Sequence, residues 1–184
     1  MRLRVSDGGG LAAIGAARLA CGISGAAPEQ AIDFTKRYQR NENPAIASLA
    51  IVRSGSTTPV TPDTPGAAAG AAVARGERVT LRAAWDACPT GSTPEGCAGA
   101  EQYLWFDPEA RVVSLRREAI RVAWFTTAGA LDADSSGRAE DEAASADADN
   151  AWTAPAAAGD ARLWLVVRDD RGGVGWQSYR VRVE

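Results

Sequence analysis

The chain of 184 residues contains no histidine, one lysine, one methionine and three cysteines. Without histidine there can be no Ser-His-Asp or Cys-His catalytic arrangement and no imidazole ligand for a metal ion. Three cysteines are too few for a four-thiolate zinc site. No run of about eighteen apolar residues is present, so the sequence predicts no transmembrane helix. These absences exclude most common catalytic chemistries, and we expect a protein that is not an enzyme.

A basic excess is also missing, since 23 acidic residues outnumber 20 basic ones and the net charge is −3. Proteins that bind nucleic acid generally show a basic excess or a basic stripe, so no nucleic-acid partner is expected. The three glycines at 8–10 are not followed by the pattern of a phosphate-binding loop. The length suits one domain with a hydrophobic core, together with a short appendage.

The N-terminal segment, residues 1–40, permits two interpretations over RLRVSDGGGLAAIGAARLAC (2–21). A basic start, a weak apolar stretch and Ala20-Cys21-Gly22 resemble a bacterial lipoprotein signal in which Cys21 is lipidated, although Arg18 stands where the lipobox has leucine. The alternative is a β-hairpin that turns at 7–10 and belongs to a preceding domain. Residues 28–40 (PEQAIDFTKRYQR) then predict a short helix or linker.

Residues 41–184 are typical of β-strands. Apolar residues alternate with polar ones over 78–85, 119–127, 162–168 and 177–183, and Trp85 and Trp124 fall on the apolar faces. Shorter strands are expected at 46–52, 103–106 and 111–115, and a hairpin turn at 169–173. The Pro- and Gly-rich stretch from 53 to 70 predicts a surface loop. About seven short strands without a long helix indicate an all-β, antiparallel β-sandwich with an N-terminal hairpin and helix extension.

The strand-and-turn pattern carries a family resemblance. The ending WTAPAAAGDARLWLVVRDDRGGVGWQSYRVRVE, the entry NENPAIASLAI and the strand GERVTLRAAWD resemble bacterial immunoglobulin-like or PKD-like modules of surface lipoproteins. The resemblance covers about residues 41–184 and implies an immunoglobulin-like sandwich in the cell envelope or outside the cell, including the outer membrane. It implies a role as spacer, stalk or adhesive unit and does not assign a ligand.

Cys88 and Cys97 lie nine positions apart in DACPTGSTPEGCAGAEQ. A loop of this size closes readily, and we expect a disulfide, which also suits an exported protein. The alternative is a pair of free thiols in a cytosolic protein. Cys21 is then left over for lipidation, for a partner in a missing domain, or as a free thiol.

The segment from Asp132 to Asp149 is strongly acidic. Asp132, Asp134 and Ser136, followed by Gly137, match the beginning of a calcium-binding loop, in which oxygen ligands alternate and a glycine allows the turn. Position twelve of that loop is Ala143, where a glutamate is expected. The alternative is a solvated loop between strands, with no cofactor bound.

Six tryptophans are many for this length. Trp164 and Trp176 are expected on the outward faces of the two strands that flank the turn at 169–173, where they could pair across the hairpin. Such a pair offers a surface for sugar stacking or an interface. The alternative is that both rings pack beneath loops.

From these features we expect a non-catalytic structural or adhesive module of the cell envelope. Other envelope proteins or surface glycans are the expected partners, and a lipid on Cys21 would be the only membrane contact. The alternative function is a ligand-binding domain that depends on carbohydrate or calcium.

Overall fold

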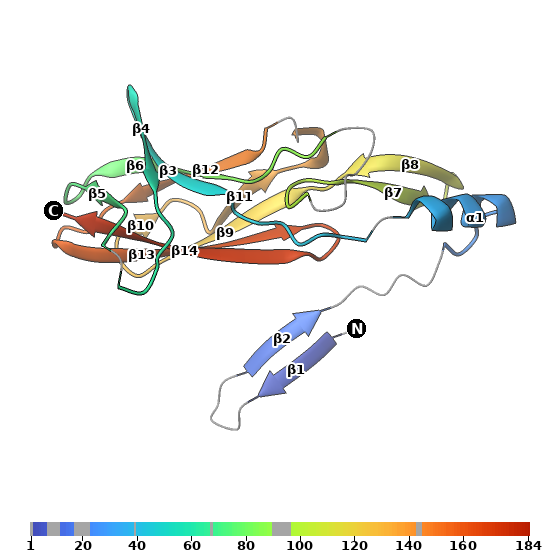
Figure 1. The fold of residues 1–184 in the computed structure, drawn as a ribbon, viewed down its shortest axis with the longest axis horizontal. Coiled ribbons are helices and arrows are strands. Elements are labelled where there is room, and N and C mark those ends of the chain that lie inside the picture. The colour runs from blue at the N-terminus through green and yellow to red at the C-terminus, as the bar shows by residue number, and fades with distance from the viewer. Residues whose placement is uncertain are drawn as a thin grey trace. The chain divides into compact units, whose positions relative to one another are not determined.

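The computed structural model describes the backbone of residues 2–6 and 12–16, and residues 23–38, 40–66, 68–89, 97–142 and 145–184 in full. Contacts divide the chain into two compact units. The first contains Met1–Arg40 and Tyr103–Arg116, and the second contains Asn41–Gln102 and Arg117–Glu184. Figure 1 labels the elements of both units, which are taken separately below.

The first unit contains two hairpins and a helix. Strand β1 (Arg2–Ser6) pairs antiparallel with β2 (Ala12–Ala16), and β7 (Gln102–Asp107) pairs with β8 (Val112–Arg117). The helix α1 (Pro28–Arg37) starts at a proline, which suits a first helical position. No residue of α1 is buried, and the exposed Lys36 lies in its last turn. None of the described helices is long and apolar enough to cross a membrane.

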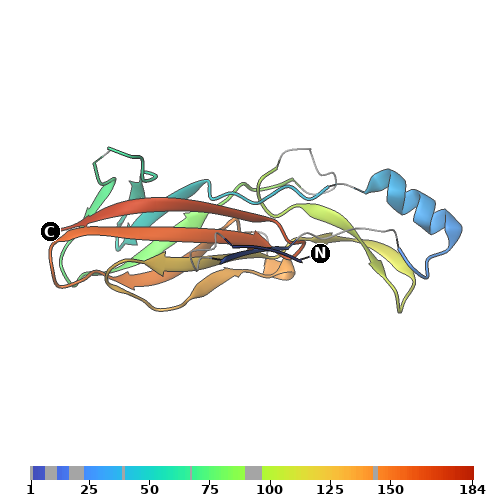
Figure 2. The same cartoon turned by 90° about the horizontal axis from the view of Figure 1, so that it is seen from below.

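The second unit is a sandwich of two five-stranded sheets. The sheet that we call the β6 sheet has the order β10 (Ala130–Leu131), β12 (Asp147–Thr153), β6 (Arg78–Ala84), β3 (Ser48–Arg53) and β4 (Ser56–Val60). The β13 sheet has the order β11 (Ser135–Arg138), β9 (Ile120–Thr126), β13 (Gly159–Asp169), β14 (Val174–Val183) and β5 (Ala71–Val73). Figure 2 shows β13 and β14, in orange and red, as one long hairpin.

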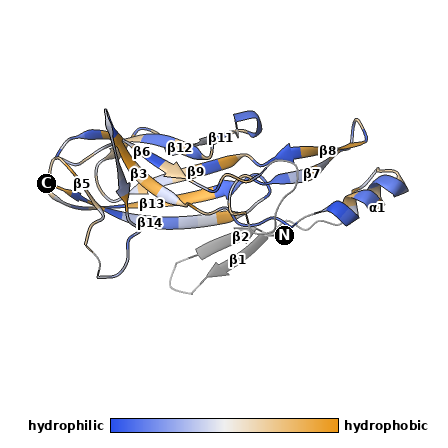
Figure 3. Ribbon diagram, turned by 45° about the horizontal axis from the view of Figure 1, so that its top comes forward, coloured by the Kyte–Doolittle hydropathy of each residue, from blue (hydrophilic) through white to orange (hydrophobic). Residues whose placement is uncertain are grey.

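Alternation along the strands creates the core between the sheets. Every second residue of β6, β9, β13 and the C-terminal half of β14 is buried, and Figure 3 shows hydrophobic and hydrophilic residues alternating along these strands. Trp85 and Trp124 are 4% and 3% exposed, which confirms their expected core positions. Trp152 on β12 is fully buried as well. The all-β sandwich expected from the sequence is therefore present.

The prediction of a structureless loop from 53 to 70 was wrong. Strand β4 occupies Ser56–Val60 and pairs with β3, and Pro62 forms an isolated bridge with Tyr179. Because β4 is an edge strand, the proline at position 59 removes no hydrogen bond that a further strand would need. Just after this stretch, β5 pairs in parallel with the end of β14.

The acidic segment is also more regular than predicted. It follows directly on β10, contains β11 and a 3-10 helix at Glu140–Glu142, and β12 begins within it at Asp147. The chain passes from the β6 sheet at β10 to the β13 sheet at β11. The buried Asn150 holds this passage, because its side chain accepts a hydrogen bond from the Ala133 N–H and donates one to the Ala133 carbonyl.

Candidate binding surface

The side of the β13 sheet that points away from the core carries exposed aromatic and aliphatic side chains. We call this side, formed by β9, β13 and β14, the outer face. Three of its side chains are among the most exposed large hydrophobic residues of the described chain: Trp176 (68% exposed), Phe125 (53%) and Val174 (45%). Trp164 and Val166 are half-buried between them. Exposed apolar groups on adjacent strands of one sheet are typical of an interaction site.

Strand register fixes how these side chains neighbour one another. Trp164 on β13 lies opposite Phe125 on β9, and Trp176 on β14 lies opposite Val166 on β13. The two tryptophans therefore share the outer face, but they are diagonal neighbours and not a directly opposed pair. In the described part of the chain, ring-to-ring contact occurs between Phe34 and Tyr38 and not between these tryptophans. Trp176 is largely exposed, whereas Trp164 is half-buried.

Arginines surround the aromatic group on the outer face. Arg162 and Arg180 share Asp63, with shortest N–O distances of 3.3 and 2.5 Å, and Arg182 pairs with Asp160 at 3.0 Å. The remaining two arginines of the face are at 121 and 168. These two are exposed and lie directly opposite each other on β9 and β13, and neither forms an ion pair with any described residue.

A cleft of about 610 Å³ adjoins this arginine pair. Arg121 and Arg168 line it together with Ser135, Gly137 and Arg138 of the edge strand β11. Arg138 donates to Asp147 on β12 at 3.0 Å and so links the two sheets, while its buried Nε has no acceptor. The cleft therefore offers hydroxyl and guanidinium donors beside the aromatic group.

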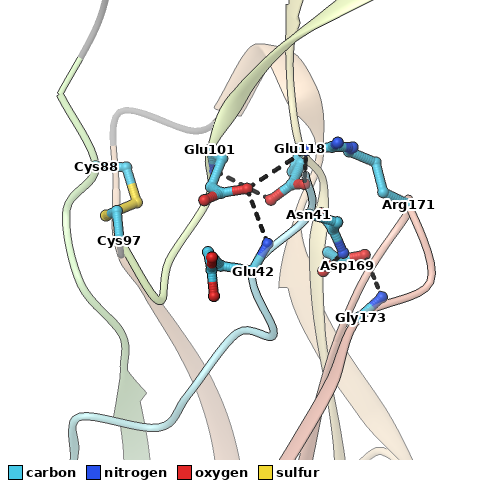
Figure 4. A network of polar contacts seen from close by, with 9 residues as sticks. All are labelled: Asn41, Glu42, Cys88, Cys97, Glu101, Glu118, Asp169, Arg171 and Gly173. Carbon is cyan, nitrogen blue, oxygen red and sulfur yellow. Dashed lines mark hydrogen bonds and ion pairs between the residues drawn. A yellow bond between two sulfur atoms is a disulfide. The ribbon is translucent and has the colours of Figure 1, made fainter. Parts of the chain in front are cut away.

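A buried polar cluster lies at the end of the sandwich where β13 turns into β14 (Figure 4). Arg171 of the turn donates to Glu101, which precedes β7, at 3.3 Å, and to Glu118, which follows β8, at 3.2 Å. The side chains of all three residues are at most 5% exposed. Burial away from water raises the pKa of Glu118 to about 8, and the nearby Asp169 and Glu101 carboxylates add to the rise while Arg171 opposes it. Burial also raises the pKa of Glu101.

Asp169 extends the cluster toward the N-terminal end of the second unit. Its carboxylate accepts hydrogen bonds from the Gly173 N–H at 2.7 Å and from the Asn41 side-chain amide at 2.9 Å. A Cβ atom on Gly173 would overlap with the Asp169 carboxylate, which explains the glycine. The ion pairs from Arg171 to Glu101 and Glu118 hold the β13–β14 turn in place. Because both glutamate side chains are buried, they do not form an acid–base pair that is open to a substrate.

The disulfide expected from the sequence joins Cys88 and Cys97, whose Cα atoms are 5.8 Å apart. Cys88 is buried, and its carbonyl accepts a hydrogen bond from Arg117 at 3.4 Å. Nearby, the Ala45 N–H donates to the carbonyl of Ala98. The disulfide thus fixes the segment that leads from β6 to Glu101. Cys21 lies outside the described residues.

The predicted calcium ligands make other contacts. Both carboxylate oxygens of Asp132 accept hydrogen bonds from Arg78, at 3.0 and 2.5 Å. The Asp134 carbonyl accepts the Trp124 N–H, and the Ser136 hydroxyl accepts the indole N–H of Trp124 at 2.9 Å. No group of three or more acidic or cysteine residues that could hold a metal occurs among the residues with described side chains. Calcium binding by this segment stays a prediction.

Sequence reasoning missed Phe125 and the buried cluster. Phe125 follows Arg121 and Ala123 at every second position of β9, so the alternation that placed Trp124 inward was also the signal that places Phe125 outward. The cluster joins residues 17, 53 and 70 positions apart, and no local pattern connects them. Comparison of the chain with models of protein families, with curated proteins and with solved structures finds no match.

Proposed function

We propose that the protein is a non-catalytic adhesion module that binds glycans through the outer face of the β13 sheet. The observation that carries this proposal is the group formed by Phe125, Trp164 and Trp176 on three adjacent strands. Aromatic rings on a rigid sheet present flat apolar surfaces, and ordering a ligand on them costs the protein little conformational entropy.

The distribution of acidic residues favours a binding role over hydrolysis. Two-carboxylate hydrolysis requires two acidic groups that can both reach a substrate. Glu101 and Glu118 are shielded from solvent, and Asp169 is engaged by Gly173 and Asn41. Asp132 is held by Arg78. Each of these carboxyl groups thus has a structural contact that accounts for its presence.

We propose further that the second unit is an immunoglobulin-like module. Immunoglobulin domains have the strands A, B, E and D in one sheet and C, F and G in the other. The order β10-β12-β6-β3 corresponds to D-E-B-A, and β9-β13-β14 corresponds to C-F-G. A buried tryptophan on strand C is common in that fold, and Trp124 on β9 is the matching residue. The β7–β8 hairpin would be an insertion between strands B and C.

An envelope or extracellular location is part of the proposal. Disulfides persist in oxidising compartments and are rare in the cytosol, so the Cys88–Cys97 bridge supports export. A lipid anchor at Cys21 remains compatible with this location. In that setting the outer face would meet surface glycans or glycosylated envelope proteins.

A glycan array with variants of the outer face tests the proposed function. The wild-type chain is compared with Trp176→Ala and with the double variant Phe125→Ala, Trp176→Ala. We expect the wild type to bind a subset of glycans and the double variant to lose at least about tenfold in affinity, because stacking of a planar base on an aromatic side chain contributes about 1–3 kcal/mol in single-strand nucleic-acid sites and sugar stacking uses the same kind of surface.

The matched control is Leu115→Ala on β8, which removes an exposed apolar side chain (55% exposed) from a strand outside the β13 sheet. This control should bind as the wild type does. Unchanged binding by the double variant would show that the outer face is not the site. No binding to any glycan by the wild type would refute the glycan-binding role and leave a spacer role.

A further inference from the structure

We propose that the ligand of the outer face is an acidic polysaccharide, in which sugar rings stack on the aromatic group and a carboxylate binds between Arg121 and Arg168. This inference rests on the proposed function and adds the chemical class of the ligand.

The arginine pair is the first observation. Arg121 and Arg168 are directly opposite across β9 and β13, a position where like charges destabilise a sheet. Neither guanidinium has an ion-pair partner among the described residues, although the other three arginines of the outer face each have an aspartate. A carboxylate bound between the two would remove the repulsion and form charge-assisted hydrogen bonds.

The cleft beside Arg121 and Arg168 offers further hydrogen-bond donors to the ligand carboxylate. Its volume of about 610 Å³ lies within the usual range for sites of small ligands. Ser135, whose hydroxyl can donate a hydrogen bond, and Arg138 belong to its lining, while the Arg138 Nε itself is buried. Three acidic residues, Glu142, Asp169 and Asp170, also line the cleft. The Asp169 carboxylate is occupied by Gly173 and Asn41, and Asp170 is exposed. The Glu142 carboxylate accepts the Ala139 N–H at 3.4 Å.

The distance between the arginine pair and the aromatic group restricts the chemical class of the ligand. Residues of a strand that share a face are about 7 Å apart, so Val166 and its neighbour Trp176 are one step from the arginine pair. A ligand that contacts both Trp176 and the arginine pair must carry a flat apolar ring face and a negative charge about 7 Å apart. A uronic acid residue combines both in one sugar unit, whereas a neutral glycan lacks the charge and inorganic phosphate lacks the ring.

Other occupants fit the face less well. The outer face has five arginines and one aspartate, and a second aspartate reaches it from the segment after β4: Arg121, Arg162, Arg168, Arg180, Arg182, Asp160 and, after β4, Asp63. Its positive charge would repel the same face of a second copy. A peptide that adds a strand to a sheet binds its edge, whereas the aromatic group lies on the face of central strands. Clustered arginines also bind acidic peptide motifs, so the test includes an acidic peptide.

The test uses calorimetric titration of the full chain with three uronate polymers: polygalacturonate, alginate and hyaluronan. Fully methyl-esterified polygalacturonate serves as a matched neutral probe with the same rings, and poly-glutamate serves as an acidic peptide. The variants are Trp176→Ala, Arg168→Gln and, as control on the same face, Arg182→Gln, whose arginine already pairs with Asp160.

We expect at least one uronate polymer to bind, with at least tenfold weaker binding of the esterified probe and of both the Trp176→Ala and Arg168→Gln proteins. The Arg182→Gln control should change the affinity for the same uronate polymer by less than threefold. Equal binding of the esterified probe would overturn the acidic ligand while the glycan-binding role survives. Stronger binding of poly-glutamate than of all three uronates would identify an acidic peptide as the ligand and overturn the proposal. Failure of all three uronates to bind would overturn it as well.

Discussion

The tryptophans show how burial decides the role of a residue in this protein. Trp152 is fully enclosed between the sheets, and its indole N–H donates to the Ala128 carbonyl at 3.1 Å. Gly129 lies against the same ring, since a Cβ there would approach the Trp152 Nε1 to 2.6 Å. Trp176 is 68% exposed. One indole is thus part of the core, and the other is available for contacts with a ligand.

Substitution of these two tryptophans should therefore have opposite consequences. Trp152→Ala removes a large core side chain, and we expect the free energy of unfolding to fall by about 3–5 kcal/mol. Trp176→Ala should change it by no more than about 0.5 kcal/mol, because the ring is largely in water. Urea unfolding followed by far-UV circular dichroism measures both. A large loss in Trp176→Ala would mean that this ring supports the fold, and its effect on binding would then need to be interpreted as a folding defect.

Residue-level prediction from the sequence succeeded where alternation was clean. The inward positions of Trp85 and Trp124 follow from strands that alternate over five or more residues. Trp152 was not assigned because its strand alternates small and polar residues, and the inward set includes Ala148 and Asn150. Asn150 is inward because its amide binds the Ala133 backbone, which is a tertiary contact that hydropathy does not report.

At the level of elements, the central strands were predictable and the edges were not. Strands β6, β9, β13 and the C-terminal half of β14 combine β-branched or aromatic residues with clear alternation. The edge strands β4, β5, β10 and β11 are short and contain proline, glycine, alanine or serine. Edge strands bury little surface, so pairing with a neighbour stabilises them more than their own composition does. The acidic residues of β12 face outward and pair with arginines, as Asp149 does with Arg82 at 2.7 Å.

The segment between β6 and β7 depends on its disulfide. The bond closes a loop across nine positions, and the chain-entropy model gives it roughly 2–3 kcal/mol of stabilisation. We expect the double variant Cys88→Ser, Cys97→Ser to lose this amount in urea unfolding, and reduced wild type to behave like the variant. The comparison is made in a Cys21→Ala background, which removes the third thiol.

The same bond offers a check on location. Protein recovered from its native cells under alkylating conditions should carry no alkyl group on Cys88 or Cys97 until a reductant is added. Alkylation of both thiols without reductant would contradict export, and equal stability of the oxidised and reduced forms would contradict the structural role of the bond.

At the scale of the whole molecule, the free energy of unfolding depends on pH through two sets of carboxyl groups. One set has lowered pKa values and the other has raised values, so the two sets act in opposite directions. Hydrogen bonds from Arg53 and from Ser145 lower the pKa of Glu77 and of Asp147, respectively, so their contribution is lost as the pH falls through these lowered values. Glu118 retains its proton in the folded state up to about pH 8, whereas an unperturbed glutamate releases it near 4.5. Its contribution is complete below about pH 4.5 and is lost as the pH rises toward 8.

We therefore expect the free energy of unfolding to be highest near about pH 5 and to decline toward pH 8, by at most about 1.4 kcal/mol per pH unit for one retained proton. Glu118→Gln should flatten most of this decline, because glutamine keeps the uncharged form at every pH. The exposed Glu140→Gln is the control and should leave the profile unchanged. Urea unfolding at intervals between pH 5 and 8 measures the profile.

Direct titration of the Glu118 side-chain carboxyl by carbon NMR keeps the prediction testable if the glutamine variant fails to fold. A stability that stays flat or rises from pH 5 to 8, or a Glu118 carboxyl that titrates near 4.5, would contradict the buried, protonated state of this cluster.

All basic residues of the sandwich are arginines, and this has a practical consequence for chemical labelling. Lys36 is the only lysine and is exposed on α1, so residues 41–184 contain no primary amine at all. Reagents that couple to amines would attach the chain to a sensor or a fluorophore only through Lys36 or the amino terminus. Every covalent attachment of this kind would leave the side chains of the outer face chemically intact.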